Sequence, residues 1–236
     1  MKKLFLLFYL ITTCLLYSQK KYYFDYMFSV KESYKLSKTS FNSVFLVNSK
    51  NNSFNLYAHE NEDHLKFIMH FTDQKGVRFN SQLPKIDFYK AKIISNTCNE
   101  VVRFYNPYKE KGKEYNFINY ADTIINDTSY FHYAIKSNKK LKYQKRKKIV
   151  TTHFIVEKSD PNFLPFTYIP TLYETWKISK AIPNGIPKII YFIDTKGEQT
   201  GKMEIRAVQI DKYATIPIEC DYSNPNILID KLVDRK

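Results

Sequence analysis

Apolar and polar side chains alternate along most of this chain, and a repeat of two residues predicts β-strands. Residues 41–47, FNSVFLV, read as one apolar strand, and residues 22–30, YYFDYMFSV, as another. Glycine is scarce, with 5 in 236 residues, and no long stretch repeats with helical spacing. The pattern predicts a mostly β protein whose first strand turns one face inward, made of Tyr22, Phe24, Tyr26, Phe28 and Val30.

Three hairpins can be aligned on this pattern so that apolar residues share a side. The first turns at residues 60–63 and pairs Ala58 with Leu65, Leu56 with Phe67 and Phe54 with Met69. The second joins residues 130–136 to 149–156 and pairs Phe131 with Phe154, Tyr133 with Thr152 and Ile135 with Val150. The third joins residues 188–194 to 202–210 and pairs Ile193 with Met203, Tyr191 with Ile205 and Ile189 with Ala207.

Residues 86–95 and 97–105 also have strand composition, so successive antiparallel strands predict a meander, as a strongly curved sheet or half-barrel. Residues 159–187 break the pattern, because they hold five of the nine prolines together with many apolar side chains. We expect this proline-rich segment to cover the concave face of the sheet, with a short helix at residues 171–179. A second short helix is expected at the C-terminus, capped by Asn224.

The N-terminus has the layout of a secretory signal peptide, with two lysines, an apolar run over residues 4–16 and the small residue Ser18. Cleavage there would leave Gln19 first, which resembles secreted β-rich proteins of Bacteroidota. Two alternatives stay open, namely an uncleaved signal anchor and a lipid on Cys14. We therefore expect a secreted or periplasmic protein with a single domain, residues 19–236, and no transmembrane span in the mature chain.

Two cysteines, Cys98 and Cys220, follow the signal, and an even number in an oxidising compartment suggests one disulfide. Free buried thiols are the alternative.

The chain is basic, with a formal charge of +14 that becomes +12 without Lys2 and Lys3. Residues 139–148, KKLKYQKRKK, concentrate this charge at the tip of the second hairpin. An anionic envelope surface is one partner that such a stretch could contact, and a solvated loop is the alternative. Export argues against nucleic acid. The contact residues would be Lys140, Lys142, Lys145, Arg146, Lys147 and Lys148.

Histidines are the main candidates for chemistry. In the expected registers His59 faces His64, and His132 faces His153. The first pair could hold Zn²⁺ or Cu²⁺ only with a third ligand, and no spaced ligand motif accompanies either pair. We therefore predict no metal site, no cofactor and no catalytic residue. Nucleophile, phosphate-loop and metalloprotease motifs are absent, although dispersed acids leave a secreted hydrolase open.

The expected architecture resembles the half-barrel of periplasmic lipoprotein carriers. That resemblance implies an exported, non-catalytic protein that binds a lipid or lipidated partner in an apolar cavity. The alternative function is an envelope interaction or structural protein that uses its basic loop. Aromatic residues expected to line the cavity are Phe24, Phe28, Phe67, Phe131, Phe154, Trp176 and Tyr191.

Overall fold

One large antiparallel sheet organises the molecule. The computed structural model describes residues 19–35, 37–158, 160–217 and 220. Its 13-stranded sheet has the order β7-β5-β4-β3-β2-β1-β13-β12-β11-β10-β8, with β6 beside β13 and β9 beside β10. The strands are β1 (Gln19–Tyr34), β2 (Ser37–Asn48), β3 (Asn51–Glu60), β4 (Lys66–Asp73), β5 (Val77–Pro84), β6 (Ile93–Ser95), β7 (Val101–Arg103), β8 (Tyr115–Asn119), β9 (Thr123–Ile125), β10 (Thr128–Ser137), β11 (Thr151–Glu157), β12 (Pro187–Ile193) and β13 (Gln199–Pro217). The expected mostly antiparallel β fold is confirmed.

Helices are short and few. They are α2 (Lys85–Lys90), α3 (Leu141–Arg146), α4 (Pro170–Ile178) and the 3-10 turns η1 (Cys98–Glu100) and η2 (Lys111–Glu114). Helix α4 confirms the one expected at residues 171–179, and Pro170 occupies its first turn. The helix expected after Asn224 lies outside the described residues. None of the described helices is long and apolar enough to span a membrane.

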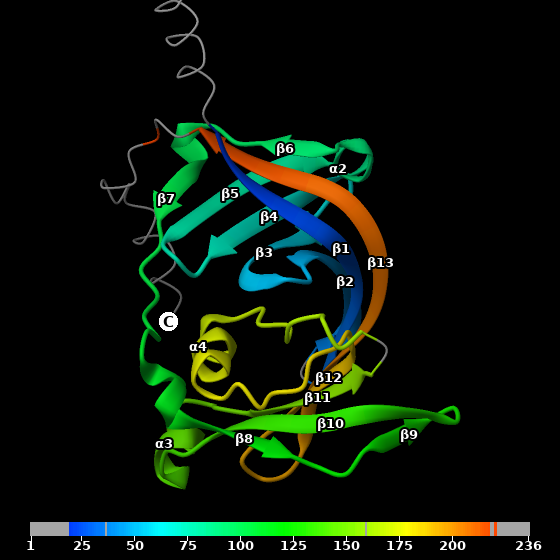
Figure 1. The fold of residues 1–236 in the computed structure, drawn as a ribbon, viewed down its shortest axis with the longest axis vertical. Helices are drawn as coiled ribbons and strands as arrows, with labels where there is room; N and C mark the ends of the chain where they lie inside the picture. The colour runs from blue at the N-terminus through cyan, green and yellow to red at the C-terminus, as the bar shows by residue number, and fades with distance from the viewer. Residues whose placement is uncertain (1–18, 36, 159, 218–219, 221–236) are drawn as a thin grey trace, which may run out of the picture.

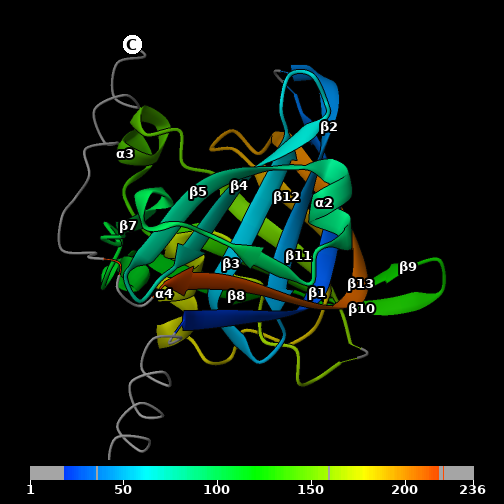
Figure 2. The same ribbon diagram turned by 90° about the horizontal axis from the view of Figure 1, so that it is seen from above.

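The sheet bends around the long central pair β1 and β13 (Figure 1). Strands β3, β4 and β5 lie in the upper half of that view, and β8, β10, β11 and β12 lie in the lower half. Residues 160–186, which we call the cover segment, lie inside the bend together with α4. Viewed from above, α2 and the β9–β10 hairpin project to the same side of the molecule (Figure 2).

A β-bulge interrupts the pairing of β1 with β13. Phe24 pairs with Lys212 of β13, whereas Tyr26 pairs with Gln209, so two residues of β13, 210 and 211, lie opposite the single residue Asp25. The extra residue therefore belongs to β13, and β1 keeps its alternation. Tyr22, Phe24, Phe28 and Val30 are all buried, which confirms the prediction that residues 22–30 present one apolar face.

The described residues form two hydrophobic cores, and β2 lies between them, because Val44 and Leu46 enter the first core whereas Phe45 and Val47 enter the second. Tyr22 and Phe24 enter the first core, whereas Phe28 and Val30 enter the second. The first core also contains Phe88 of α2, and it comprises Tyr22, Phe24, Val44, Leu46, Phe54, Leu56, Ala58, Phe67, Met69, Phe71, Val77, Phe79, Phe88, Ile94, Val101, Ala214, Ile216 and Cys220. The second core comprises Phe28, Val30, Phe45, Val47, Tyr133, Ile135, Phe154, Val156, Phe163, Phe166, Leu172, Ile182, Ile190, Met203 and Ile205.

The first two hairpins form, but in other registers than expected. In the first hairpin the partner of each β3 residue lies four positions later than predicted, so that Ala58 pairs with Met69, Leu56 with Phe71 and Phe54 with Asp73. Leu65 falls in the turn and is 69% exposed. In the second the shift is two, so that Phe131 pairs with Val156, Tyr133 with Phe154 and Ile135 with Thr152. Even shifts keep the same residues on the same face, so periodicity does not distinguish these registers.

The third hairpin is shifted by an odd number, which changes its inward face. Ile190 pairs with Met203 and is fully buried, while Tyr191 pairs with Lys202 and Ile189 with Glu204. The run KIIYFID has no clear alternation, so both faces fitted the sequence equally well. Residues 86–95 also differ from the expected strand, because they form α2 and the short β6. Of the strand expected at residues 97–105, only the three residues of β7 form.

A disulfide joins η1 to the end of the described chain. Cys98 and Cys220 are bonded, with their Cα atoms 5.0 Å apart and a sequence separation of 122. Cys220 belongs to the first core and is only 6% exposed. The bond therefore closes a long loop around that core.

Reduction of this bond should destabilise the protein by about 4 kcal/mol, because a loop of this length restricts the unfolded chain strongly. Urea unfolding of the mature chain with and without a thiol reductant measures the change. The double variant C98A/C220A is the control, and its unfolding midpoint should not respond to reductant. An unchanged midpoint in wild-type protein whose mass shows complete reduction would contradict this assignment.

Candidate functional site

The concave face of the lower half is an aromatic floor. Phe28 of β1, Phe45 of β2 and Phe154 of β11 are each no more than 4% exposed. Tyr133 of β10 stacks on Phe154 with ring centroids 4.8 Å apart. This floor has the apolar character of a ligand site, but in this structure it is covered.

The cover segment supplies the covering side chains. Phe163 stacks on Phe28 at 5.8 Å, and Phe166 packs edge-on against Phe28 at 5.1 Å and against Phe45 at 5.2 Å. The chain's single tryptophan, Trp176 on α4, packs against the same core. The expectation that the proline-rich segment covers the concave face is confirmed by these contacts.

Few hydrogen bonds hold the cover segment to the sheet. The Leu164 amide donates to the Ser49 carbonyl (2.8 Å), and the Thr167 hydroxyl donates to the Asn52 carbonyl (2.6 Å). The described residues between β11 and β12 contain no strand, so this layer has no ladder. At its far end the Gly185 amide donates to the Phe163 carbonyl (2.8 Å), and only glycine fits there, because a Cβ would lie 2.1 Å from the Glu157 carbonyl oxygen.

Little free volume remains under the cover. Two small cavities flank Phe166, each with about 10 Å³ of free space, which is at the lower limit for one water molecule. One is lined by Tyr133, Phe154, Leu172 and Trp176 among others. The floor is therefore filled by the protein's own side chains.

Larger hollows lie elsewhere and are open to solvent. The largest, about 690 Å³, lies between α2 and β9 and is lined by charges of both signs, including Lys31, Glu204 and Arg206. Another, about 510 Å³, lies beside α3. Neither has the enclosed apolar walls that an acyl chain requires.

A row of polar side chains borders the floor. Glu32 of β1 is only 5% exposed, and its carboxylate accepts hydrogen bonds from the Ser43 hydroxyl (2.6 Å) and the Tyr34 hydroxyl (2.9 Å). The Tyr57 hydroxyl is also hydrogen-bonded to Glu32 and Ser43. Burial, followed by the nearby carboxylate charge, raises the pKa of Tyr57 to about 12. No cationic side chain forms an ion pair with Glu32 among the described residues.

The row continues across β3, β4 and β5. His59 lies directly opposite Ser43 and two residues from Tyr57, so the three share one face. The Nε2 atoms of His59 and His70 are 3.3 Å apart, and His70 Nδ1 is 2.8 Å from Asn80 Oδ1. Burial lowers the pKa of His70. We call Glu32, Tyr34, Ser43, Tyr57, His59, His70 and Asn80 the polar row.

The expected pairing of His59 with His64 was wrong, because the register shift places Ile68 opposite His59. His64 instead contacts the Glu60 carboxylate in the turn (2.7 Å). Sequence reasoning missed the polar row because its members meet only in the observed registers. One signal was available, since Glu32 continues the alternation of Phe28 and Val30 and so occupies a core position.

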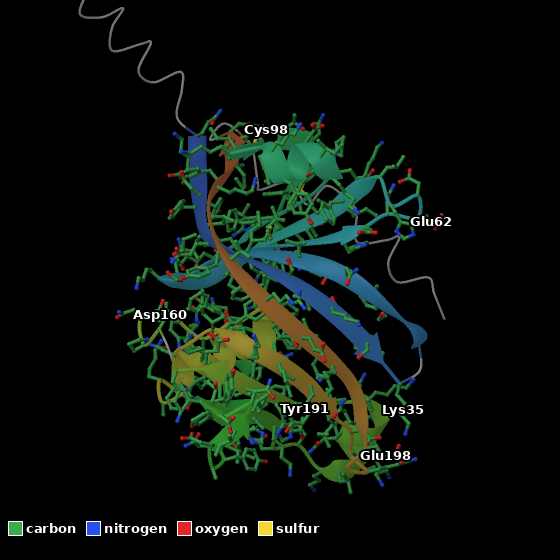
Figure 3. The ribbon with its side chains drawn as sticks, turned by 90° about the vertical axis from the view of Figure 1, so that its right-hand side faces the viewer. Lys35, Glu62, Cys98, Asp160, Tyr191 and Glu198 are labelled. Carbon is green, nitrogen blue, oxygen red and sulfur yellow. A yellow bond between two sulfur atoms is a disulfide. The ribbon has the colours of Figure 1, made fainter. Side chains whose placement is uncertain are left out.

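A second histidine pair lies away from the cover. His132 is opposite Ile155 rather than His153, yet its Nε2 atom is 3.1 Å from His153 Nδ1 along the diagonal. The Tyr191 hydroxyl is 3.1 Å from His132 Nε2. Burial lowers the pKa of both histidines. Figure 3 shows Tyr191 in the lower half of the molecule and Cys98 at the upper end.

The seven aromatic residues expected to line one site are divided among three places. Phe28 and Phe154 form part of the floor, with Phe131 and Trp176 packed at its border. The other three do not join them, and the odd register shift accounts for Tyr191 alone. Phe24 and Phe67 lie in the first core, and Tyr191 stacks on His153.

The basic stretch lies where it was expected, between β10 and β11. Within it α3 forms, and Lys139 pairs with Glu114 (2.9 Å). The six predicted contact residues are all exposed, and the described residues offer them no ion pair.

Two of the dispersed acidic residues serve local roles. Asp25 accepts a hydrogen bond from the Ser49 amide (2.7 Å), and Glu100 accepts one from the Thr97 amide (2.8 Å). Within the described part of the chain, no group of three or more histidine, cysteine, aspartate or glutamate residues is placed to hold a metal ion.

No protein-family model and no curated protein sequence matches this chain. Among solved structures it is similar to MucB of Pseudomonas aeruginosa in complex with MucA, with 7% identity and a TM-score of 0.39 over 83% of this chain and 53% of that one. It is also similar to an outer membrane lipoprotein-sorting protein domain from Vibrio parahaemolyticus, with 10% identity and a TM-score of 0.34 over 89% and 92%.

A third similar structure is the LolA superfamily protein NE2245 from Nitrosomonas europaea, with 10% identity and a TM-score of 0.31 over 83% and 87%. This chain spans about half the length of the MucB chain. One of these neighbours is a lipoprotein-sorting protein domain, but TM-scores this low carry no inference about fold, ligand or partner. The resemblance to Bacteroidota proteins gains no support from these comparisons.

Proposed function

We propose that this protein is an exported, non-catalytic binding protein that takes the apolar chain of an amphiphile on the floor beneath the cover segment. The observation that carries the proposal is the aromatic floor. It ends at the buried Glu32 carboxylate, which accepts hydrogen bonds from hydroxyl groups. It is covered by the cover segment, which has no strand ladder. Ligand sites combine such an apolar wall with a few fixed polar groups.

The cover segment is the element suited to move. Its side chains occupy the floor in the way an acyl chain would, because Phe163 and Phe166 insert between aromatic rings. Its attachment rests on side-chain packing and isolated hydrogen bonds, whereas each strand is held by a continuous ladder. An apolar ligand chain can make the same contacts with the floor that the Phe166 ring makes. The floor therefore stays buried when the ligand takes the place of that ring.

Glu32 gives the proposed ligand an orientation. A buried carboxylate without a paired cation is unfavourable, and hydroxyl donors offset only part of the lost hydration. An amphiphile with an ammonium head would add a charge-assisted hydrogen bond there. We therefore propose that the head group lies at Glu32 and the tail lies along Phe28 and Phe45.

Dodecylamine should shift the fluorescence of Trp176, because that side chain packs on the cover side of the floor. Replacing Phe166 by alanine removes the competing ring, and we expect at least tenfold tighter binding together with a loss of about 3 kcal/mol in unfolding free energy. Phe71→Ala in the first core is the matched control, which should lose stability without any gain in binding. Fluorescence titration of the mature chain measures dodecylamine binding in both variants.

Equal binding to wild type, F166A and F71A, or no binding to any of them, would contradict the proposal. Dodecanoate gives a further comparison, because the Glu32 carboxylate should repel its head group and weaken its binding. In E32Q the difference in affinity between dodecylamine and dodecanoate should become smaller.

A second candidate function is contact with an anionic envelope surface. The observation in its favour is that α3 carries exposed bases next to two exposed apolar side chains, Leu141 at 53% and Tyr143 at 38%. Lysine and arginine beside apolar groups suit the head-group region of an anionic bilayer. This contact would position the protein and is compatible with ligand binding.

Replacing Lys145, Arg146 and Lys147 by glutamate should weaken binding to phosphatidylglycerol vesicles by at least about 100-fold, at about 1 kcal/mol per charge. The control replaces Lys21, Lys66 and Lys90, which are exposed bases of β1, β4 and α2. Vesicle sedimentation at low and high salt measures the effect. If both triple variants lose the same affinity, only net charge is involved and α3 is not a docking element.

A further inference from the structure

The two histidines of the polar row, His59 and His70, make the same polar contacts through their ring nitrogens. His59 Nδ1 is 3.1 Å from the backbone carbonyl oxygen of Glu60, and His70 Nδ1 is 2.8 Å from Asn80 Oδ1. The two Nε2 atoms face one another at 3.3 Å. Each ring therefore turns its Nδ1 atom to an oxygen and its Nε2 atom to the other ring.

These contacts decide which nitrogen carries the proton. A carbonyl oxygen can only accept a hydrogen bond, so Nδ1 must be the donor in both rings. A neutral imidazole has one N–H group, and both Nε2 atoms are then left with lone pairs directed at each other. Two facing lone pairs repel, so something positive belongs between them.

The separation of the two Nε2 atoms fits a metal ion held between the rings. Bonds of about 2.0–2.1 Å from one tetrahedral metal ion to two nitrogens set those nitrogens about 3.3 Å apart, which is the distance observed. Histidine ligands also commonly donate their other N–H group to a carbonyl oxygen, as both rings do here.

We propose that His59 and His70 hold one divalent transition-metal ion, of the zinc and copper class, between their Nε2 atoms. The remaining coordination positions are open to water or to a donor atom of a bound molecule, because no third histidine, cysteine or carboxylate joins the pair among the described residues. Neutral imidazole suits this class of metal. The site does not depend on the proposed ligand under the cover, although Tyr57 stacks on both rings.

The other histidine pair is a natural control. His132 Nε2 lies 3.1 Å from the Tyr191 hydroxyl, which can donate a hydrogen bond to it, so this nitrogen has a partner besides the other ring. Its contact with His153 is made through Nδ1 of that ring, and not through two Nε2 atoms. Two histidine pairs of similar spacing in one chain therefore differ in whether a lone pair is left over.

Calorimetric titration of the untagged mature chain with ZnCl₂ tests the site. We expect one equivalent to bind to wild type and to H153Q, and the binding to be lost in H59Q and H70Q. Asn80→Leu should weaken it 10-fold to 100-fold, because a partner outside the coordination sphere is removed. Retention in H59Q and H70Q, or loss in H153Q, would overturn the proposal.

Nitrogen NMR of the wild-type imidazoles covers the case in which the histidine variants fail to fold. Without metal, both Nε2 atoms of His59 and His70 should have the shift of an unprotonated nitrogen at pH 7.5, and zinc should move these two signals and leave the Nδ1 signals protonated. A doubly protonated ring in that pair, with nitrogen signals that do not change on addition of zinc, would show a shared proton and would contradict the proposal.

Discussion

The pairing of β1 with β13, interrupted by one bulge, is the constraint on which the rest of the molecule depends. The two strands run together from Gln19 opposite Pro217 to Tyr34 opposite Gly201. At the bulge the Asp25 carboxylate accepts hydrogen bonds from both the amide and the hydroxyl of Ser49, in the turn after β2. This attachment fixes the residue opposite the bulge in β13, and β1 places Phe24 in one core and Phe28 in the other.

The two cores then take different roles. The first is closed by α2, β6, β7 and the disulfide, and it fixes the upper half of the sheet. The buried Lys212 strengthens that closure, because its ammonium group donates to the carbonyl oxygens of Phe88 and Tyr89 at the end of α2, both at 2.9 Å. The second core is completed by an irregular layer instead of a strand or long helix. Ligand-binding segments are usually drawn from the less stable parts of a protein, and the second core is the less firmly closed of the two.

Much of this architecture could be predicted from the sequence, and the misses share a cause. Strand composition, the proline-rich break at residues 159–187 and the helix behind Pro170 are local signals, and each was found. Registers are not local, because an even slip leaves Phe67 and Met69 on the same face, and the bulge in β13 opposite Asp25 depends on the pairing of two distant strands. Residues 86–90 form a helix because Phe88 packs into the first core, so tertiary contact overrides strand propensity.

The candidate site was harder to predict than the fold for the same reason. Phe28 and Phe154 could be named from their apolar character, but Phe24 and Phe67 have the same character and lie in the other core. The polar row joins single residues from consecutive strands, and its histidine pair exists only in the observed β3–β4 register. A charged residue at a core position, such as Glu32, is the signal that local reasoning could have used.

The central claim is that the cover segment opens independently of the sheet. Native-state hydrogen exchange tests it most directly, because the Leu164 amide is hydrogen-bonded to Ser49 outside the cover segment, while the β1 and β13 amides are held in the ladder. The account predicts that the Leu164 amide exchanges through a local opening with a free energy well below that of global unfolding. Equal protection of the Leu164 amide and the β1–β13 amides would contradict it and make the second core an ordinary closed core.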